Sequence, residues 1–134
     1  MFELDHRLSA DTVELARWSL CRVLLMNDSN YPWLILVPQR PGLRDYDEVA
    51  GADRGVLDGE ITRACAALRK LFKPHKLNVA SLGNAVPQLH IHVIARQTTD
   101  PAWPKPVFGM VPATPYTAQA LATFREHFTA AAGN

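Results

Sequence analysis

Residues 88–96 decide the fold, and they read Gln88-Leu89-His90-Ile91-His92-Val93-Ile94-Ala95-Arg96. Polar and apolar residues alternate through most of this run, which is typical of a β-strand with one buried face. The two faces carry different side chains: Leu89, Ile91, Val93 and Ala95 on one, and Gln88, His90, His92 and Arg96 on the other. The sequence therefore predicts two imidazoles about 7 Å apart on one surface, where both can act on a small anionic group.

Three interpretations of the His-x-His spacing are open from the residues alone. The pair could face solvent on an ordinary amphipathic strand, bind zinc or another metal, or supply a nucleophile and its partner. A metal site needs a third ligand, but no Cys, Asp or Glu follows His92 within a few residues. His6 and His75 are distant in the sequence. We therefore expect no metal and no other cofactor.

The segments before this strand predict an antiparallel sheet and one long helix. Residues 20–26 and 33–37 are apolar runs joined by turn-forming residues, which indicates a hairpin. Residues 53–72 predict a helix that Pro74 ends, with one apolar face. That face carries Leu57, Ile61, Ala64, Leu68 and Leu71. Residues 77–82 and 89–95 predict two more strands around a tight turn.

The two ends of the chain predict shorter helices. Ser9 is a candidate N-cap for a short N-terminal helix, and Thr114-Pro115 are candidates for the N-cap and first residue of a last helix. We expect an α+β fold in a single domain over residues 1–134. Its core covers about residues 1–100, and a Pro-rich tail and the C-terminal helix follow over 101–134.

The composition limits the partners. Lys and Arg number 14 and Asp and Glu number 13, a balance that argues against binding a nucleic acid polymer through net charge but allows a nucleotide. Cys21 and Cys65 have no CxxC spacing, so we expect free thiols and a cytoplasmic location. The N-terminal residues carry charges throughout, and no apolar run is long enough for a membrane span.

The run QLHIHVIAR resembles the signature of the histidine triad (HIT) superfamily, in which three histidines alternate with apolar residues. His90 matches the middle histidine and His92 the third, whereas Gln88 stands at the first position, giving a Gln-His-His variant. The order of strands and helix over residues 20–96 is similar as well, and residues 100–104 resemble a bacterial branch of HIT-like proteins. The resemblance implies an antiparallel five-stranded sheet, one long helix, and short N-terminal and C-terminal helices.

The resemblance also implies a nucleotide hydrolase or nucleotidyltransferase, acting on a dinucleoside polyphosphate or a nucleoside phosphoramidate. His90 would attack the α-phosphorus and form a nucleotidyl-histidine intermediate. His92 would neutralise the phosphate and assist proton transfer. Gln88 can orient a group but cannot carry a proton, so a nucleotide-binding protein of the same fold without catalysis is the alternative.

Further site residues follow from the same resemblance. Asp28 or Asn27 would bind the ribose, Asn84 in a shortened loop would contact phosphate, and Arg96 would steer the polyphosphate. Each has a structural alternative, since the first three suit turns and Arg96 could pair with a carboxylate. Trp33 stands where many members carry a histidine. The resemblance implies a homodimer with the long helix near its interface.

Overall fold

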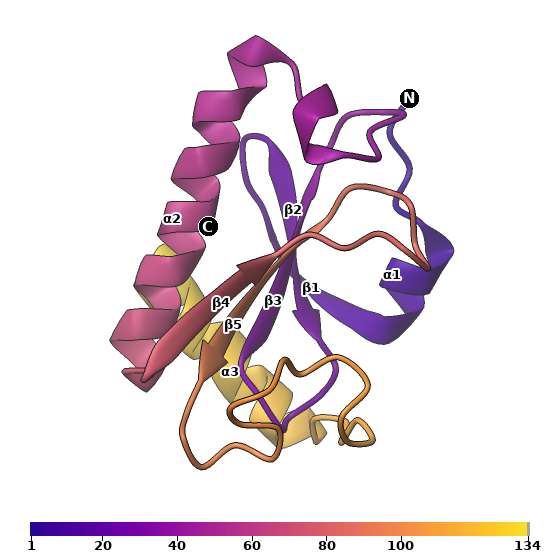
Figure 1. Cartoon of the computed structure of the whole chain (residues 1–134). Helices are drawn as coiled ribbons and strands as arrows, with labels where there is room; N and C mark the ends of the chain where they lie inside the picture. The colour runs from indigo at the N-terminus through magenta and orange to yellow at the C-terminus, as the bar shows by residue number, and fades with distance from the viewer. Residues whose placement is uncertain (134) are drawn as a thin grey trace.

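A computed structural model describes residues 1–133 of the chain. Its centre is a five-stranded sheet in the order β1-β2-β3-β5-β4, with every neighbouring pair antiparallel (Figure 1). The strands are β1 (Thr12–Arg17), β2 (Cys21–Met26), β3 (Trp33–Pro38), β4 (Lys76–Ala80) and β5 (Ile91–Arg96). The helices are α1 (His6–Asp11), α2 (Gly51–Phe72) and α3 (Ala118–Ala132), with a 3-10 turn over Tyr46–Glu48. The expected α+β fold is confirmed.

The central elements agree with the apolar patterns that predict them. Helix α2 buries Leu57, Ala64 and Leu68. It ends at Phe72, and the C-cap Lys73 takes a left-handed conformation one residue before Pro74. Strands β2 and β3 form the expected hairpin, with Leu24 opposite Ile35. Strand β4 pairs with β5, as expected, but β4 ends at Ala80 and β5 begins at Ile91, so the loop over residues 81–90 replaces the predicted tight turn.

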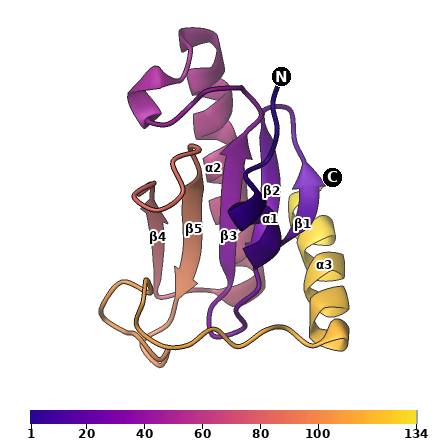
Figure 2. The same cartoon turned by 90° about the vertical axis from the view of Figure 1, so that its right-hand side faces the viewer.

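The sheet has two covered faces (Figure 2). Helices α2 and α3 cover the first face, which receives Leu89, Ile91, Val93 and Ala95 together with Phe124 and Phe128. The N-terminal segment and the chain after β5 cover the second face, where Leu8, Ala102 and Val107 pack on Trp33 and Ile94. His92 and Arg96 have the same strand parity as Ile94, so both side chains belong to the second face.

The predictions for the chain ends need correction. Helix α1 begins after Asp5 rather than after Ser9, and Asp5 caps it by accepting a hydrogen bond from the Arg7 backbone. Residues 12–17 then form strand β1 instead of continuing a helix, because they pair with β2 through the register Val13 to Leu25. This long-range ladder overrides the local capping signal at Ser9.

Helix α3 begins later than expected, at Ala118, with Thr117 as its N-cap. The predicted start at Thr114-Pro115 is wrong because the Thr114 backbone N–H donates to the Asp28 carboxylate, 3.1 Å away. The N-terminal end of the helix is thereby displaced to the next residue that can cap it.

A buried glutamate joins α2 to the sheet. The Glu60 carboxylate accepts hydrogen bonds from the backbone N–H groups of Leu20 (2.9 Å) and Cys21 (2.8 Å). Cys21 is buried and Cys65 half-buried, and both are free thiols. Burial, followed by the nearby Glu60 carboxylate, raises the pKa of Cys21 well above its ordinary value. Within residues 1–133, no helix has the length and apolarity that a membrane crossing requires.

Candidate active site

His90 and His92 line one pocket of about 230 Å³. The rest of its wall comes from the loop before β5, residues Leu82, Gly83, Asn84, Ala85 and Val86. Gly83 has φ of 76°, a left-handed conformation that glycine adopts without strain and that turns this loop over the histidines. Both imidazoles are buried, and their ring centres lie 5.0 Å apart. Asn84, which was predicted to contact phosphate, therefore lies in the wall of the same pocket as the two histidines.

The backbone fixes the tautomer of His90. Its Nδ1 lies 2.7 Å from the carbonyl oxygen of Gln88. Because a carbonyl oxygen can only accept, the imidazole Nδ1 must carry the proton in this contact. The neutral ring then keeps a lone pair on Nε2, as a nucleophile requires.

His92 lies in more apolar surroundings. Its ring packs against Phe108 at 4.9 Å and Trp33 at 5.7 Å between ring centres. The indole Nε1–H of Trp33 donates a hydrogen bond to Nδ1 of His92 at 2.9 Å. Burial, with His90 as a second cause, lowers the pKa of His92 from 6.5 to about 4. At neutral pH this imidazole therefore has no charge with which to neutralise a phosphate.

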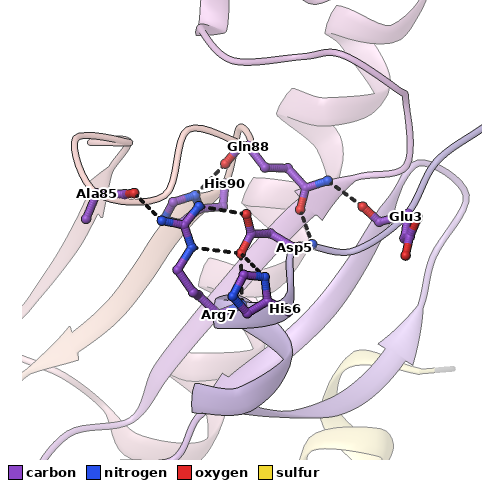
Figure 3. Close-up of polar contacts among 7 residues, drawn as sticks. All are labelled: Glu3, Asp5, His6, Arg7, Ala85, Gln88 and His90. Carbon is purple, nitrogen blue, oxygen red and sulfur yellow. Dashed lines mark hydrogen bonds and ion pairs between the residues drawn. The ribbon is translucent and has the colours of Figure 1, made fainter.

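Gln88 does not line the histidine pocket, which corrects the prediction from strand alternation. Regular strand geometry begins at Ile91, so the alternation does not extend back to Gln88. Its side-chain oxygen accepts from the Asp5 backbone N–H at 2.8 Å, and its amide nitrogen donates to the Glu3 carbonyl at 2.9 Å (Figure 3). The side chain thus binds the N-terminal segment, and the backbone carbonyl contacts His90.

We call this arrangement of Glu3, Asp5, Arg7, Ala85 and Gln88 the N-terminal clasp. Besides the Gln88 contacts, it includes an ion pair of 3.0 Å between Arg7 and Asp5. Arg7 Nη1 also donates to the Ala85 carbonyl at 2.8 Å, which ties the clasp to the pocket wall (Figure 3). Hydrogen bonds from Arg7 lower the pKa of Asp5 to about 2. Sequence reasoning missed the clasp because its partners lie about 80 residues apart.

Arg96 is held by protein groups rather than left open to a ligand. Its side chain is 1% exposed, and it pairs with Asp100 at 2.7 Å. Further N–H groups donate to the Asn78 side chain and the Lys105 carbonyl. The expectation that Arg96 steers a polyphosphate is therefore corrected: it pairs with a carboxylate, inside the protein. Burial raises the pKa of Asp100, but the hydrogen bond and charge of Arg96 and the backbone N–H groups of Trp103 and Ala102 together lower it, and the net shift is downward.

Asp28 and Asn27 do not line the histidine pocket either. Asp28 is buried and accepts hydrogen bonds from Asn30 and from the Thr114 backbone. Asn27 accepts from the Tyr116 backbone at 2.9 Å and lines a separate pocket of about 320 Å³. Both residues of the turn thus hold the segment that leads into α3.

Metal-ligating side chains do not gather in threes anywhere in residues 1–133. His90 and His92 accordingly have no third His, Cys, Asp or Glu with which to hold an ion. The chemistry that the pocket offers is that of two imidazoles, and the neutral form of His90 has a nucleophilic Nε2.

A family model and several solved structures agree on the family that this chain resembles. The family model described as HIT domain matches residues 8–99. A crystal structure of a histidine triad protein from Bradyrhizobium japonicum is 40% identical, with TM-score 0.96 and 98% of each chain covered. Another from Sinorhizobium meliloti is 41% identical, with TM-score 0.95, covering 97% of this chain and 96% of that one.

A third, from Marinobacter aquaeolei, is 44% identical, with TM-score 0.96, covering 98% of this chain and 96% of that one. No curated protein matches the sequence. The family model spans well over half of the chain, and the three structures agree with it in sequence and in fold. This chain therefore belongs to the HIT domain family.

Proposed function

We propose that this protein is a nucleotide hydrolase or nucleotidyltransferase that works through a nucleotidyl-histidine intermediate on His90. Its substrate would be a dinucleoside polyphosphate or a nucleoside phosphoramidate. The observation that carries the proposal is the contact between His90 Nδ1 and the Gln88 carbonyl, which leaves a lone pair on Nε2. This ring lines a pocket large enough for a phosphate group.

The proposed reaction has two displacements. Nε2 of His90 attacks the α-phosphorus, and the bond from phosphorus to the leaving group breaks with its electron pair on that group, which takes up a proton from solvent where it needs one. A water oxygen then attacks the same phosphorus, the N–P bond breaks, and its electrons return to Nε2. The water gives up its proton to solvent, and the nucleoside monophosphate leaves.

The surrounding residues support a phosphate subsite. Asn84 is exposed in the pocket wall, and its side-chain amide can donate to a phosphate oxygen. The proposed ribose contacts, Asp28 and Asn27, bind the backbone of Thr114 and Tyr116. These bonds use one carboxylate oxygen of Asp28 and the amide oxygen of Asn27, so the second carboxylate oxygen and the amide nitrogen remain for a ribose hydroxyl.

Incubation with diadenosine tetraphosphate or adenosine 5′-phosphoramidate tests the proposal. We expect AMP to accumulate with the wild type and not with His90→Asn, measured by chromatography. His127→Asn is the matched control, because this histidine is exposed on α3, whose buried side faces the other side of the sheet. Absence of AMP release by the wild type across a panel of such compounds would reject the proposal.

One observation favours a second candidate, a nucleotide-binding protein without turnover. The side chain at the first position of the triad, Gln88, is bound to the N-terminal segment and cannot transfer a proton. This candidate predicts calorimetric binding of AMP that His90→Asn weakens, with no release of AMP from either compound above.

We further propose a homodimer and a cytoplasmic location. Strand β4 is an edge of the sheet, and Val79 and Leu82 beside this edge are about half exposed. An apolar sheet edge is available for pairing with a second copy. Sedimentation equilibrium should give about twice the mass of one chain, and Val79→Lys should shift it toward the monomer. The free thiols of Cys21 and Cys65 suit a reducing compartment.

A further inference from the structure

The contact between Trp33 and His92 joins two strands across the second face of the sheet. Trp33 is the first residue of β3 and His92 the second residue of β5, and the indole Nε1–H donates to Nδ1 at 2.9 Å. Both side chains are buried, with 7% and 5% of their surfaces exposed. Phe108 packs on both rings, so the contact lies in an apolar setting where solvent does not compete for it.

This contact determines where His92 carries its proton. An indole nitrogen can donate but never accept, so Nδ1 of His92 must be the acceptor. A neutral imidazole with an unprotonated Nδ1 has its proton on Nε2. His90 receives the opposite assignment, because its Nδ1 faces a carbonyl oxygen. The two neighbouring rings are therefore held in complementary tautomers by two different partners.

We propose that Trp33 is a positioning residue that holds His92 as its neutral Nε2–H tautomer, so that this imidazole serves the site as a hydrogen-bond donor and not as a cation or an acid. The use of that donor on a phosphate oxygen rests on the function proposed above. The assignment of the tautomer rests on the geometry alone.

The surrounding charges agree with a neutral ring. The ionisable side chains on this side of the sheet include His90, Tyr31 and Arg96. Arg96 is engaged by Asp100, and Tyr31 packs edge-on against Trp33. Burial favours the uncharged form, and a protonated Nδ1 would have to face the Trp33 N–H, donor against donor. A neutral imidazole does not release its Nε2 proton near neutral pH, so protonation of a leaving group falls to solvent.

The wild-type protein allows a direct test by NMR with uniform 15N labelling. We expect a through-hydrogen-bond N–N coupling between Trp33 Nε1 and His92 Nδ1. At pH 7 the His92 ring should show a protonated Nε2 and an unprotonated Nδ1. Detection of a proton on His92 Nδ1 at pH 7 would overturn the proposal without the need for any variant.

The variant Trp33→Phe keeps an aromatic ring and removes the donor. In this variant we expect His92 to populate both tautomers and its pKa to rise toward the ordinary value. Trp18→Phe is the matched control: Trp18 packs on Phe128 on the first face, and its Nε1 has no hydrogen-bond partner within residues 1–133. It should leave the His92 spectrum unchanged. A single Nε2–H tautomer that persists in folded Trp33→Phe would reject the role of Trp33.

Measurements of AMP release give a second test of the role of Trp33. If the wild type releases AMP, we expect Trp33→Phe to lower kcat/KM by about tenfold, the factor that corresponds to one hydrogen bond. Its pH profile should gain a titration that the wild type lacks. If the wild type releases no AMP but shows the coupling, the proposed function fails and the tautomer assignment holds. If the wild type releases AMP but carries a proton on Nδ1 and shows no coupling, the tautomer assignment fails and the proposed function holds.

Discussion

The amide side chain of Gln88 connects the N-terminal segment to the residue that precedes the site. We expect Gln88→Ala to lower the free energy of unfolding by about 0.5–1.5 kcal/mol, because it removes a half-buried hydrogen bond to the Asp5 N–H and an exposed one to the Glu3 carbonyl. Release of AMP should survive, since the backbone carbonyl still holds His90. Urea unfolding and the AMP assay measure the two effects. Loss of AMP release as complete as in His90→Asn would show that the side chain takes part in chemistry.

His92 makes stability depend on pH in a known direction. Burial lowers its pKa from 6.5 to about 4. Between these pH values the unfolded chain binds a proton at His92 and the folded chain does not. This contribution to stability is complete above pH 6.5 and is lost as the pH falls toward 4. We expect Tm to fall over this range more steeply in the wild type than in His92→Asn. Equal slopes in the two proteins would contradict the pKa shift.

The residue types of the site were predictable, but their contacts were not. His90 and His92 are visible in the sequence because an alternating strand signals them. The bond between His90 and the Gln88 carbonyl depends on backbone geometry just before the strand, where alternation has ended. The resemblance marks Trp33 as a departure from the family, but its contact with His92 has no local signal, since the partner is 59 residues away on another strand.

At the scale of elements, the loop after β5 is held by one buried ion pair. We expect Arg96→Met to lower the free energy of unfolding by about 3–5 kcal/mol, because it leaves the Asp100 carboxylate buried without its partner. The double variant Arg96→Met with Asp100→Leu should recover part of this loss. Thermal unfolding of the wild type and the two variants measures the recovery. A single variant as stable as the wild type would show that Asp100 finds another partner.

Elements that neighbouring residues determine were predictable from the sequence, whereas elements that depend on distant contacts were not. Helix α2 and the β2–β3 hairpin follow from repeated apolar positions and clear turn residues, and they lie within two residues of their expected ends. Strand β1 and the start of α3 depend on pairing with β2 and on the Asp28 carboxylate, respectively. Neither contact can be read from neighbouring residues.

At the scale of the whole molecule, the chain beyond the matched family region belongs to the core. Phe128 of α3 is fully buried and stacks with Trp18 and Phe124. We expect Phe128→Ala to cost about 3–5 kcal/mol of unfolding free energy. Calorimetry should show a single transition for the wild type, as one domain requires. A second transition that Phe128→Ala shifts alone would instead mark α3 as a separate unit.

The N-terminal clasp also constrains how this sequence can change over evolution. A histidine at position 88 would restore the first position of the triad, but its two ring nitrogens point away from each other. They cannot reproduce the adjacent acceptor and donor with which the Gln88 amide binds the Asp5 N–H and the Glu3 carbonyl. Gln88→His in the present sequence should therefore give a protein with a lower free energy of unfolding. An earlier substitution that releases residues 3–5 from Gln88 would remove this loss of stability. The order of the two substitutions therefore decides whether the triad histidine can be gained without destabilising the fold.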